Sequence, residues 1–227
     1  MLILGIDDAG RGPVIGPMVL AGCLMESSME EEWKNLGITD SKQLTRTKRQ
    51  ELRQGILLGA LAHHITLTTP KEIYSQLLSG INLNSIEALK TAEIINKINS
   101  YTSWNKEKIQ VIVDCPSTNT TAWKRELERY VIKKENLTIL CEHKADQNYV
   151  ACSAASILAK TTRDQEIENL KIKIGIDFGS GYPSDPLTIK FLDQHLENFR
   201  NQDIFRETWA TIKDKDAQKA QKKLMEF

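Results

Sequence analysis

Four aspartates stand at or just after the ends of predicted strands. Asp7 and Asp8 are adjacent and end the apolar run that opens the chain, and the other two are Asp114 and Asp146. Two ionised carboxylates beside a buried strand are costly unless a cation lies near them. Carboxylate oxygens are ligands that suit Mg²⁺ or Mn²⁺. The alternative is a strand end with solvated acids before a glycine turn, and Asp7 and Asp8 alone do not decide between the two.

The positions of these acids favour a shared site. If Asp7 and Asp114 end neighbouring parallel strands, their side chains meet at the carboxyl edge of the sheet, where ligands of open α/β sheets bind. Asp146 follows the next predicted strand and can reach the same edge. Four carboxylates could hold two metal ions about 3.5–4 Å apart for in-line attack of water on a phosphodiester. No histidine or serine nucleophile is needed.

Two further segments could contact phosphates. Gly10 and Gly12 allow the backbone to approach a ligand closely, and Arg11 between them carries a guanidinium that matches a phosphate. Lys42 begins a basic helix, where it could contact a phosphate together with nearby backbone N–H groups. Asp40 or Ser41 could equally be a simple cap for that helix.

A polar stripe in a later helix has two interpretations. Ser153, Ser156, Lys160 and Arg163 recur at helical spacing among small residues. The stripe is either a solvated face or a face that meets phosphates, and the pattern does not choose.

The predicted elements that must position these residues alternate between strands and helices. The expected strands cover 2–8, 18–25, 60–68, 108–114 and 137–142. The expected helices cover 30–36, 45–58, 70–78, 82–98, 122–134, about 146–170 and 187–199. The first two strands are expected to pair antiparallel, and the last two to be a parallel pair joined by a right-handed crossover. The fold class is therefore α/β with a mixed sheet.

Composition narrows the function classes. Thirty basic residues balance thirty acidic residues, which argues against nucleic-acid binding by bulk charge alone but leaves local patches open. The longest apolar stretch, residues 14–25, is too short to span a bilayer, so we expect no membrane partner. The four cysteines are scattered singly, and Cys141, His143 and Cys152 do not have the spacing of a zinc site. We expect a cytoplasmic protein with free thiols.

Six segments together resemble a known family. They are GIDDAGRGPVIGPMVLAG, TDSKQL, VIVDCP, HKAD, SAASILAKTTRD and GSGYPSDP, in this order from residue 5 to about 186. Their combination is similar to type 2 ribonuclease H (RNase HII), and the ending IFRETWATIK is similar to the archaeal branch. The resemblance implies an RNase H-like mixed five-stranded sheet flanked by helices. It also implies a catalytic domain over 1–178 and a helical C-terminal extension over 179–227 that completes the substrate cleft.

The resemblance further implies an activity. Members cleave the RNA strand of RNA/DNA hybrids with Mg²⁺ or Mn²⁺ and cut on the 5′ side of single ribonucleotides embedded in duplex DNA. The products carry a 5′-phosphate and a 3′-hydroxyl. A monomer is implied, and a sliding clamp is a possible partner, although the terminal residues 224–227 are too generic to claim one.

For the metal ligands, the resemblance matches Asp7, Asp114 and Asp146 to three of the family's four acids. The family normally has glutamate where this chain has Asp8. Aspartate is one methylene shorter, which displaces its carboxylate by about 1.5 Å. We expect Asp8 still to bind metal, with reduced activity or a preference shifted toward Mn²⁺. A second departure is 147–150, where relatives often carry a lysine and a proline.

For the substrate, the resemblance matches Gly10, Arg11 and Gly12 to the turn that reads the 2′-hydroxyl at a ribose–deoxyribose junction. Tyr182 matches the tyrosine that stacks on the sugar of the next deoxynucleotide, and Lys42 matches a lysine near the phosphates. Two alternatives remain. One is a hybrid-binding protein whose catalysis is impaired by Asp8. The other is a nuclease that cuts DNA, against which the turn and Tyr182 argue.

Overall fold

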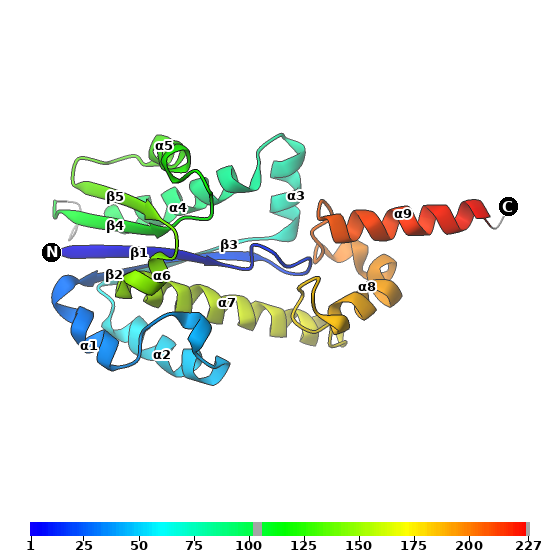
Figure 1. Cartoon of the computed structure of the whole chain (residues 1–227), viewed down its shortest axis with the longest axis horizontal. Coiled ribbons are helices and arrows are strands. Elements are labelled where there is room, and N and C mark those ends of the chain that lie inside the picture. The colour runs from blue at the N-terminus through cyan, green and yellow to red at the C-terminus, as the bar shows by residue number, and fades with distance from the viewer. Residues whose placement is uncertain (102–105, 226–227) are drawn as a thin grey trace. The chain divides into compact units, whose positions relative to one another are not determined.

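The computed structural model describes residues 1–101 and 106–225, with side chains described as far as residue 221. The chain forms two compact units (Figure 1). The first, which we call the sheet unit, consists of Met1–Ala9, Val19–Leu67 and Asn82–Thr162. The second, which we call the helical unit, consists of Gly10–Met18, Thr68–Ile81 and Arg163–Phe227. Each unit has its own buried core and is described by itself.

The sheet has five strands in the order β3-β2-β1-β4-β5. The strands are β1 (Leu2–Ala9), β2 (Met18–Glu26), β3 (Ala62–Thr68), β4 (Ile109–Asp114) and β5 (Leu137–Glu142). β1 pairs antiparallel with β2, whereas β1 with β4 and β4 with β5 are parallel pairs. The expected mixed five-stranded sheet is confirmed. Because Ile6 is in register with Val113, the residues that follow them, Asp7 and Asp114, lie at the same edge.

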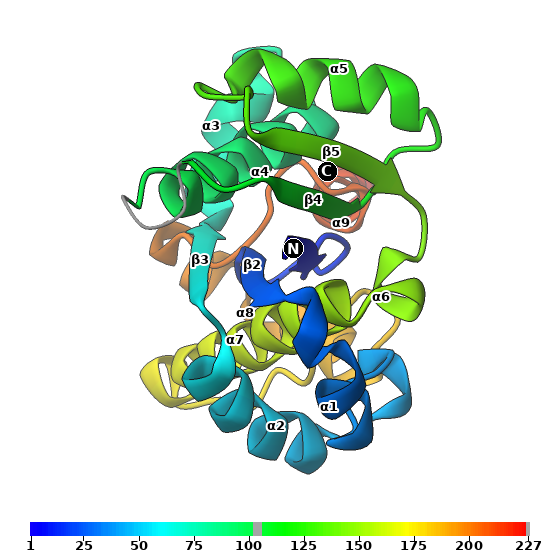
Figure 2. The same cartoon turned by 90° about the vertical axis from the view of Figure 1, so that its left-hand side faces the viewer.

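Helices cover both faces of the sheet. In Figures 1 and 2, α4 and α5 lie on one face, and α1, α2 and the start of α7 lie on the other. Their bounds are α1 (Glu30–Asn35), α2 (Arg46–Gly59), α4 (Leu83–Asn99), α5 (Thr120–Tyr130), α6 (Ala145–Asn148) and α7 (Val150–Ile174). Thr45, Asn82 and Asn119 each accept a hydrogen bond from a backbone N–H of the helix that they precede, which explains where α2, α4 and α5 begin. The short helix η1 (Ser27–Met29) precedes α1, and η2 (Ser41–Gln43) precedes α2.

Small residues bring the backbones of β1 and α7 into direct contact. A Cβ atom added at Gly5 would lie 2.1 Å from the carbonyl carbon of Ala151 and 2.3 Å from the nitrogen of Cys152. No real side chain tolerates such distances, so only glycine fits here. The buried alanines of α7 complete this close packing, because Ala151, Ala154 and Ala155 have no exposed surface.

The helical unit has a separate apolar core. It contains α3 (Pro70–Leu78), the later part of α7, α8 (Pro186–Phe199), η3 (Arg200–Gln202) and α9 (Ala210–Met225). Phe191 lies at its centre and contacts the rings of Phe178, Phe199 and Phe205. The segment Gly10–Met18 belongs to this unit, where Val14 and Ile15 are fully buried in the same core.

Several element boundaries differ from those expected. The long helix does not begin near Asp146, because Tyr149 adopts an extended backbone and separates α6 from α7. α5 starts two residues early and ends at Tyr130 rather than 134. It stops there because the next residues turn toward α4, where the side chain of Asn96 accepts a hydrogen bond from the N–H of Ile132. Asp40 caps η2 and Thr45 caps α2, so neither Asp40 nor Ser41 caps the basic helix.

The remaining expected strands and helices are present within one or two residues of their predicted bounds, except that α7 continues to Ile174. The tail is helical from Ala210. None of the helices within the described residues has the length and apolar character that crossing a membrane requires.

Candidate active site

Three of the four predicted acids meet at the carboxyl edge of the sheet. Asp7 lies on β1, Asp114 ends β4, and Asp146 lies in α6. One carboxylate oxygen of each lies within 4.8 Å of the others. Asp7 and Asp146 are buried, and Asp114 is half-buried. The parallel pairing of β1 with β4 produces this meeting, as the sequence predicts.

A tight turn brings Asp146 to the same place. Lys144, between β5 and α6, has a left-handed backbone with φ 59° and ψ 34°. This conformation is uncommon for a residue with a side chain and is often found at functional sites. The N–H of Ala145 then donates to Oδ1 of Asp114 at 3.2 Å, and Oγ of Ser153 donates to the carbonyl of Asp146 at 2.7 Å. The turn and the start of α7 together fix Asp146.

The electrostatics of this cluster favour a bound cation. Burial raises the pKa of Asp7 well above its ordinary value, and repulsion from Asp8 and Asp114 raises it further. Burial and repulsion from Asp146 likewise raise the pKa of Asp114. Oδ1 of Asp146 is buried and has no hydrogen-bond partner. Buried polar atoms are normally satisfied, so an unpartnered oxygen beside two other carboxylates fits a metal ligand. The residues present therefore fit a divalent metal.

Asp8 lies outside this group of three. Adjacent residues of a strand point to opposite faces, so Asp8 points away from the face that carries Asp7. Asp8 lines a small cavity of about 10 Å³ that is also lined by Asp7 and Asp114 of the group, and by Glu87 and Trp123 among other residues. A cavity of this size is about the space that one water molecule needs. The predicted role of Asp8 as the fourth ligand remains a prediction.

Two lysines lie close to the acids. Nζ of Lys42 is 3.3 Å from Oδ2 of Asp146, although most of the Lys42 side chain is exposed. Burial lowers the pKa of Lys42, but the attraction and hydrogen bond to Asp146 together with attraction to Asp40 and Asp7 outweigh it, and the net shift of the pKa is upward. Lys160 is more deeply placed, and burial is the main cause of its lowered pKa. Lys42 thus lies within η2 beside the acids rather than at the start of the basic helix.

Lys160 belongs to a hydrogen-bonded cluster that also contains two serines. Its ammonium donates to the hydroxyls of Ser41 and Ser156, which lie 2.7 Å from each other. Ser156 in turn hydrogen-bonds to Asp7, which lowers the pKa of Asp7 against the effects of burial and repulsion. Ser156 is fully buried and Ser153 is 3 % exposed, so the stripe on α7 is not a solvated face. Sequence reasoning considered Ser41 only as a cap, because its partner lies 115 residues away.

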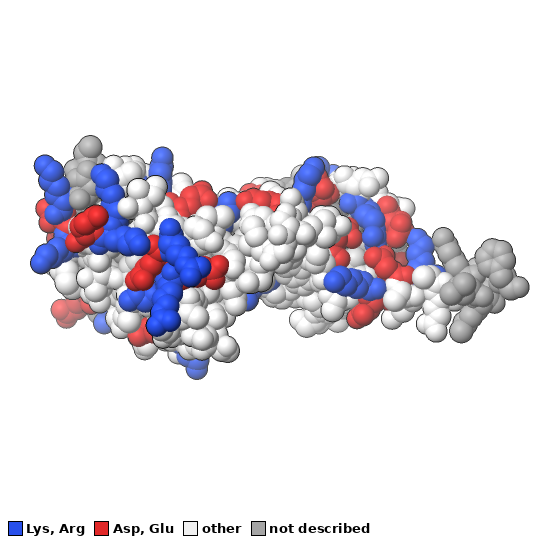
Figure 3. All heavy atoms as spheres, turned by 90° about the horizontal axis from the view of Figure 1, so that it is seen from above, with Lys and Arg blue, Asp and Glu red and all other residues white. Residues whose placement is uncertain are grey.

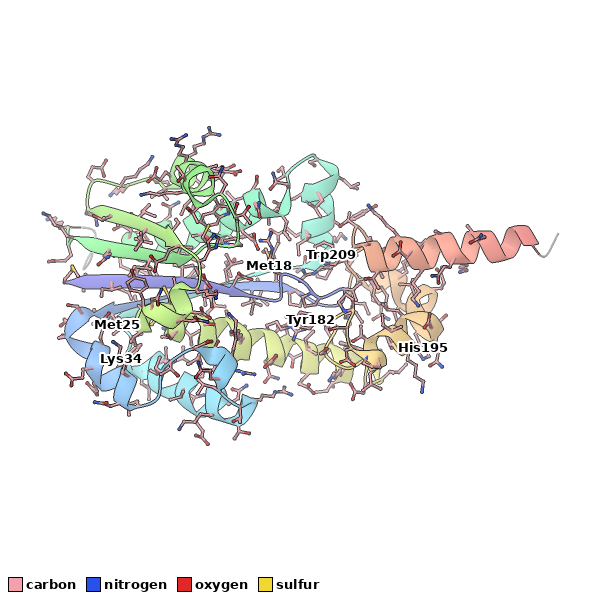
Figure 4. All side chains as sticks on the ribbon, in the orientation of Figure 1. Met18, Met25, Lys34, Tyr182, His195 and Trp209 are labelled. Atoms are coloured by element: carbon pink, nitrogen blue, oxygen red, sulfur yellow. The ribbon has the colours of Figure 1, made fainter. Side chains whose placement is uncertain are left out.

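The predicted substrate residues of the helical unit also lie together. Gly10 has φ +83°, and a Cβ atom added at Gly12 would lie 3.6 Å from the Tyr182 ring. The guanidinium of Arg163 lies over that ring, 5.1 Å from its centroid, and donates to the carbonyl of Ser180. Figure 4 labels Tyr182 at the loop that precedes α8. Tyr182 is 36 % exposed, so part of its ring is accessible to a ligand.

The surface that carries α5 shows no single-sign charge field. In Figure 3, basic and acidic side chains alternate over this part of the sheet unit. Lys124 and Glu128 form one of these pairs, with Nζ and Oε1 3.8 Å apart. A mixed face of this kind does not attract a polyanion strongly, which agrees with the balanced composition.

A mixed sheet with three aspartates gathered at its carboxyl edge is an arrangement that suits enzymes that hydrolyse phosphodiesters with metal ions bound by carboxylates. The family model of ribonuclease HII matches residues 4–212, and the chain belongs to this family. It is therefore a ribonuclease H of type 2. The expected RNase H-like fold and enzyme class are confirmed.

Relatives and solved structures agree with this assignment. Ribonuclease HII of Methanocaldococcus jannaschii is 43 % identical over 220 residues, covering 94 % of each chain. Ribonuclease HII of Pyrococcus furiosus is 39 % identical, covering 94 % of this chain and 90 % of the relative. The crystal structure of ribonuclease H2 from Pyrococcus horikoshii superposes with a TM-score of 0.82 at 36 % identity, covering 94 % of this chain and 96 % of that chain.

Two further structures extend the comparison. The RNase HII of Archaeoglobus fulgidus, solved in a complex with PCNA, has a TM-score of 0.79 at 35 % identity and covers 92 % of this chain and 95 % of that chain. Bst-RNase HIII, solved in complex with Mn²⁺, has a TM-score of 0.79 at 20 % identity and covers 94 % of this chain and 68 % of that chain. The second likeness shows the fold alone.

Proposed function

We propose that this ribonuclease H hydrolyses the RNA strand of RNA/DNA hybrids and cuts on the 5′ side of single ribonucleotides embedded in duplex DNA. The products would carry a 5′-phosphate and a 3′-hydroxyl. The observation that carries the proposal is the cluster of Asp7, Asp114 and Asp146, in which Oδ1 of Asp146 is buried without a partner. Removal of RNA and of single ribonucleotides is a task of DNA replication and repair, and we place it in the cytoplasm.

We infer that these three aspartates, with Asp8 as the fourth acid, hold Mg²⁺ or Mn²⁺, two ions being typical of such sites. When bound, the metal supplies an activated water and neutralises charge that develops on the phosphate. The protein supplies the fixed oxygens. Asp7 is held by Ser156 and by the N–H of Asp8, which donates to its Oδ1 at 2.7 Å. Lys42 lies beside Asp146 and is suited to a substrate phosphate.

Recognition of the ribonucleotide is assigned to the helical unit. The backbone of Gly10, Arg11 and Gly12 would contact the 2′-hydroxyl, which can both donate and accept a hydrogen bond. Tyr182 would stack on the sugar of the next deoxynucleotide, where a 2′-hydroxyl would clash. Its contact with Gly12 and Arg163 supports this, because the ring is held close to the turn.

Some finer expectations stay proposals. We propose a catalytic domain over 1–178 whose substrate cleft is completed by an extension over 179–227, and a monomer as the active form. A sliding clamp is a further possible partner, consistent with the PCNA complex of the Archaeoglobus relative. The side chains of residues 224–227, where such a contact was considered, lie outside the part of the chain that the structure describes.

A second candidate function rests on Asp8. Because Asp8 lies outside the group of three aspartates, catalysis could be impaired while hybrid binding persists. The shorter side chain of aspartate, where the family resemblance predicts glutamate, would likewise lower catalysis. This alternative predicts binding without cleavage in either metal.

One experiment separates the candidates. A labelled DNA duplex with one ribonucleotide is incubated with the protein in Mg²⁺ and then in Mn²⁺, beside an all-DNA duplex of the same sequence and the Asp7→Asn variant. A single cut on the 5′ side of the ribonucleotide, absent from both controls, supports the proposal. Binding without a cut in either metal supports the second candidate. Cleavage of the all-DNA duplex supports a general DNA nuclease instead.

A further inference from the structure

Arg206 is a fully buried arginine in the helical unit, just before α9. It is the largest side chain in the described part of the chain with less than 2 % exposure. An arginine cannot lose its charge in a protein, so its burial is costly unless its donors are satisfied. The carbonyl oxygens that satisfy it lie in the segment after β1. Nη2 donates to Gly10, Nη1 donates to Arg11 at 2.8 Å, and Nε donates to Gly16 at 3.1 Å.

Trp209 completes this support. Its Nε1–H donates to the carbonyl of Gly12 at 3.2 Å, and its ring lies 4.9 Å from the guanidinium carbon of Arg206. Figure 4 labels Trp209 at the start of α9. Three successive carbonyls, those of Gly10, Arg11 and Gly12, are therefore bound by the same two side chains.

Fixing these carbonyls also fixes backbone N–H groups. In a planar trans peptide, the C=O of one residue and the N–H of the next point in opposite directions. The carbonyls of Gly10 and Arg11 point toward Arg206, so the N–H groups of Arg11 and Gly12 are directed away from it. Hydrogen bonds to a charged donor are the stronger ones, so the orientation is held firmly.

We propose that Arg206 is a positioning residue for ribonucleotide selection. By holding the carbonyls of Gly10 and Arg11, it aims the N–H groups of the turn at the 2′-hydroxyl of the substrate, and Trp209 assists through Gly12. This inference rests on the proposed function, because it assumes that the turn reads a ribose. Arg206 itself touches no substrate in this scheme. Its guanidinium matters through geometry. The three donors of a lysine lie on one nitrogen and cannot span the three carbonyls that the planar guanidinium reaches.

The test measures selectivity in binding. Fluorescence anisotropy with a chelator present gives the affinity for a duplex with one ribonucleotide and for the all-DNA duplex of the same sequence. The selectivity ratio is the affinity for the duplex with one ribonucleotide divided by the affinity for the all-DNA duplex. This ratio is measured for the wild type, for Arg206→Lys, for Trp209→Phe and for the control Arg200→Lys. Arg200 lies in the same unit and pairs with the carboxylates of Asp216 and Glu207.

We expect Arg206→Lys to lower the ratio by about tenfold, the value of one well-placed hydrogen bond. Arg200→Lys should leave the ratio unchanged. Calorimetry should show an unchanged affinity for Mn²⁺ in both variants, since the aspartates belong to the sheet unit. A lower melting temperature with an unchanged ratio would show that Arg206 has a merely structural role and would overturn the inference.

Two further outcomes keep the test decisive. If Arg206→Lys fails to fold, Trp209→Phe decides, because it keeps an aromatic ring beside Arg206 and removes the indole N–H that donates to Gly12. A fall in the selectivity ratio of Trp209→Phe, smaller than the tenfold expected for Arg206→Lys, supports the inference. An unchanged ratio in Trp209→Phe overturns it. If the wild-type protein shows no preference for the ribonucleotide, the proposed function itself fails, which is a different result from the loss of a preference in the variants.

Discussion

Asp8 is one of the two places at which the family resemblance predicts a departure, and the structure shows which residues line the cavity beside it. Its neighbour Asp7 joins the aspartate group, and both residues line a cavity of about 10 Å³ together with Asp114 and Glu87. A glutamate at position 8 would carry its carboxylate one methylene further from the strand, beside a cavity that two of the grouped aspartates also line.

Asp8→Glu is expected to increase turnover in Mg²⁺, by up to about a hundredfold, because a ligand misplaced by about 1 Å can cost that much. The gain in Mn²⁺ should be smaller if the shorter acid already favours that ion. Steady-state rates on the single-ribonucleotide duplex in each metal measure the effect. Unchanged rates in both metals would show that the length of this acid does not limit the enzyme.

Ser156 is a second residue whose position matters for the metal. Its hydroxyl bonds to Asp7 and is itself held by Ser41 and Lys160. Removing a hydrogen-bond partner of a metal ligand typically costs 10–100-fold in affinity. Ser156→Ala should therefore weaken Mn²⁺ binding by about that factor in isothermal titration calorimetry. Ser100→Ala, at an exposed serine of the same unit, is the matched control. Equal affinities in both variants would contradict the orienting role.

At the scale of elements, the turn before α8 carries Tyr182 on a frame that does not depend on its ring. The N–H of Ser180 donates to Oδ2 of Asp185 at 2.7 Å, and the N–H of Gly181 donates to Oγ1 of Thr188 at 3.0 Å. The carbonyl of Gly181 accepts from the N–H of Val14 at 2.8 Å. The backbone of the turn should thus survive truncation of the tyrosine.

Tyr182→Ala is accordingly expected to leave the fold intact and to lose most cleavage at a single embedded ribonucleotide. Stacking of a base on an aromatic ring contributes about 1–3 kcal/mol; a contribution of this order from the sugar contact corresponds to roughly a fivefold to 150-fold loss. Tyr74→Ala is the control, because Tyr74 lies in the same unit and has a similar exposure of 38 %. A cleavage rate equal to that of the control would mean that Tyr182 only packs the turn.

The elements also show how far the sequence was informative. The strand that carries Asp7 and the one that ends at Asp114 were predictable, because apolar runs with β-branched residues lead into these carboxylates. The break at Tyr149 was not, since nothing in its local sequence opposes a continuous helix.

Contacts between residues far apart in the chain could likewise not be predicted from the local sequence. Ser41 and Ser156 are 115 residues apart, and Arg206 is 196 residues from Gly10. No periodicity or local spacing links such pairs. The acids could be listed from the sequence, but the hydrogen bonds that orient Asp7 required the fold.

At the scale of the whole molecule, the aspartate site opposes the stability of the metal-free protein. The pKa values of Asp7 and Asp114 are raised above the ordinary value of 3.8. A group with a raised pKa stabilises the folded state below its unfolded pKa and loses that contribution as the pH rises through its folded pKa. The metal-free protein should therefore lose stability as the pH rises above about 4, and metal should restore it.

Asp7→Asn tests this balance. With a chelator at pH 7, the variant should melt at a higher temperature than the wild type, by about 2–4 °C for each kcal/mol gained, and the difference should vanish at low pH. Added Mg²⁺ should stabilise the wild type more than the variant, and cleavage by the variant should be lost. A lower melting temperature of the variant in chelator would contradict the electrostatic account, and appreciable cleavage would contradict the metal role of Asp7.

The contact at Gly5 has a consequence for how freely the protein can change. Because β1 and α7 meet backbone to backbone there, no side chain acts as a spacer between the strand that carries Asp7 and the helix that carries Ser156. The distance between Asp7 and Ser156 therefore depends on this backbone contact and not on the size of an apolar side chain between strand and helix. Position 5 is constrained, since even one added methyl group would force strand and helix apart and would be felt two residues away, at the acid itself.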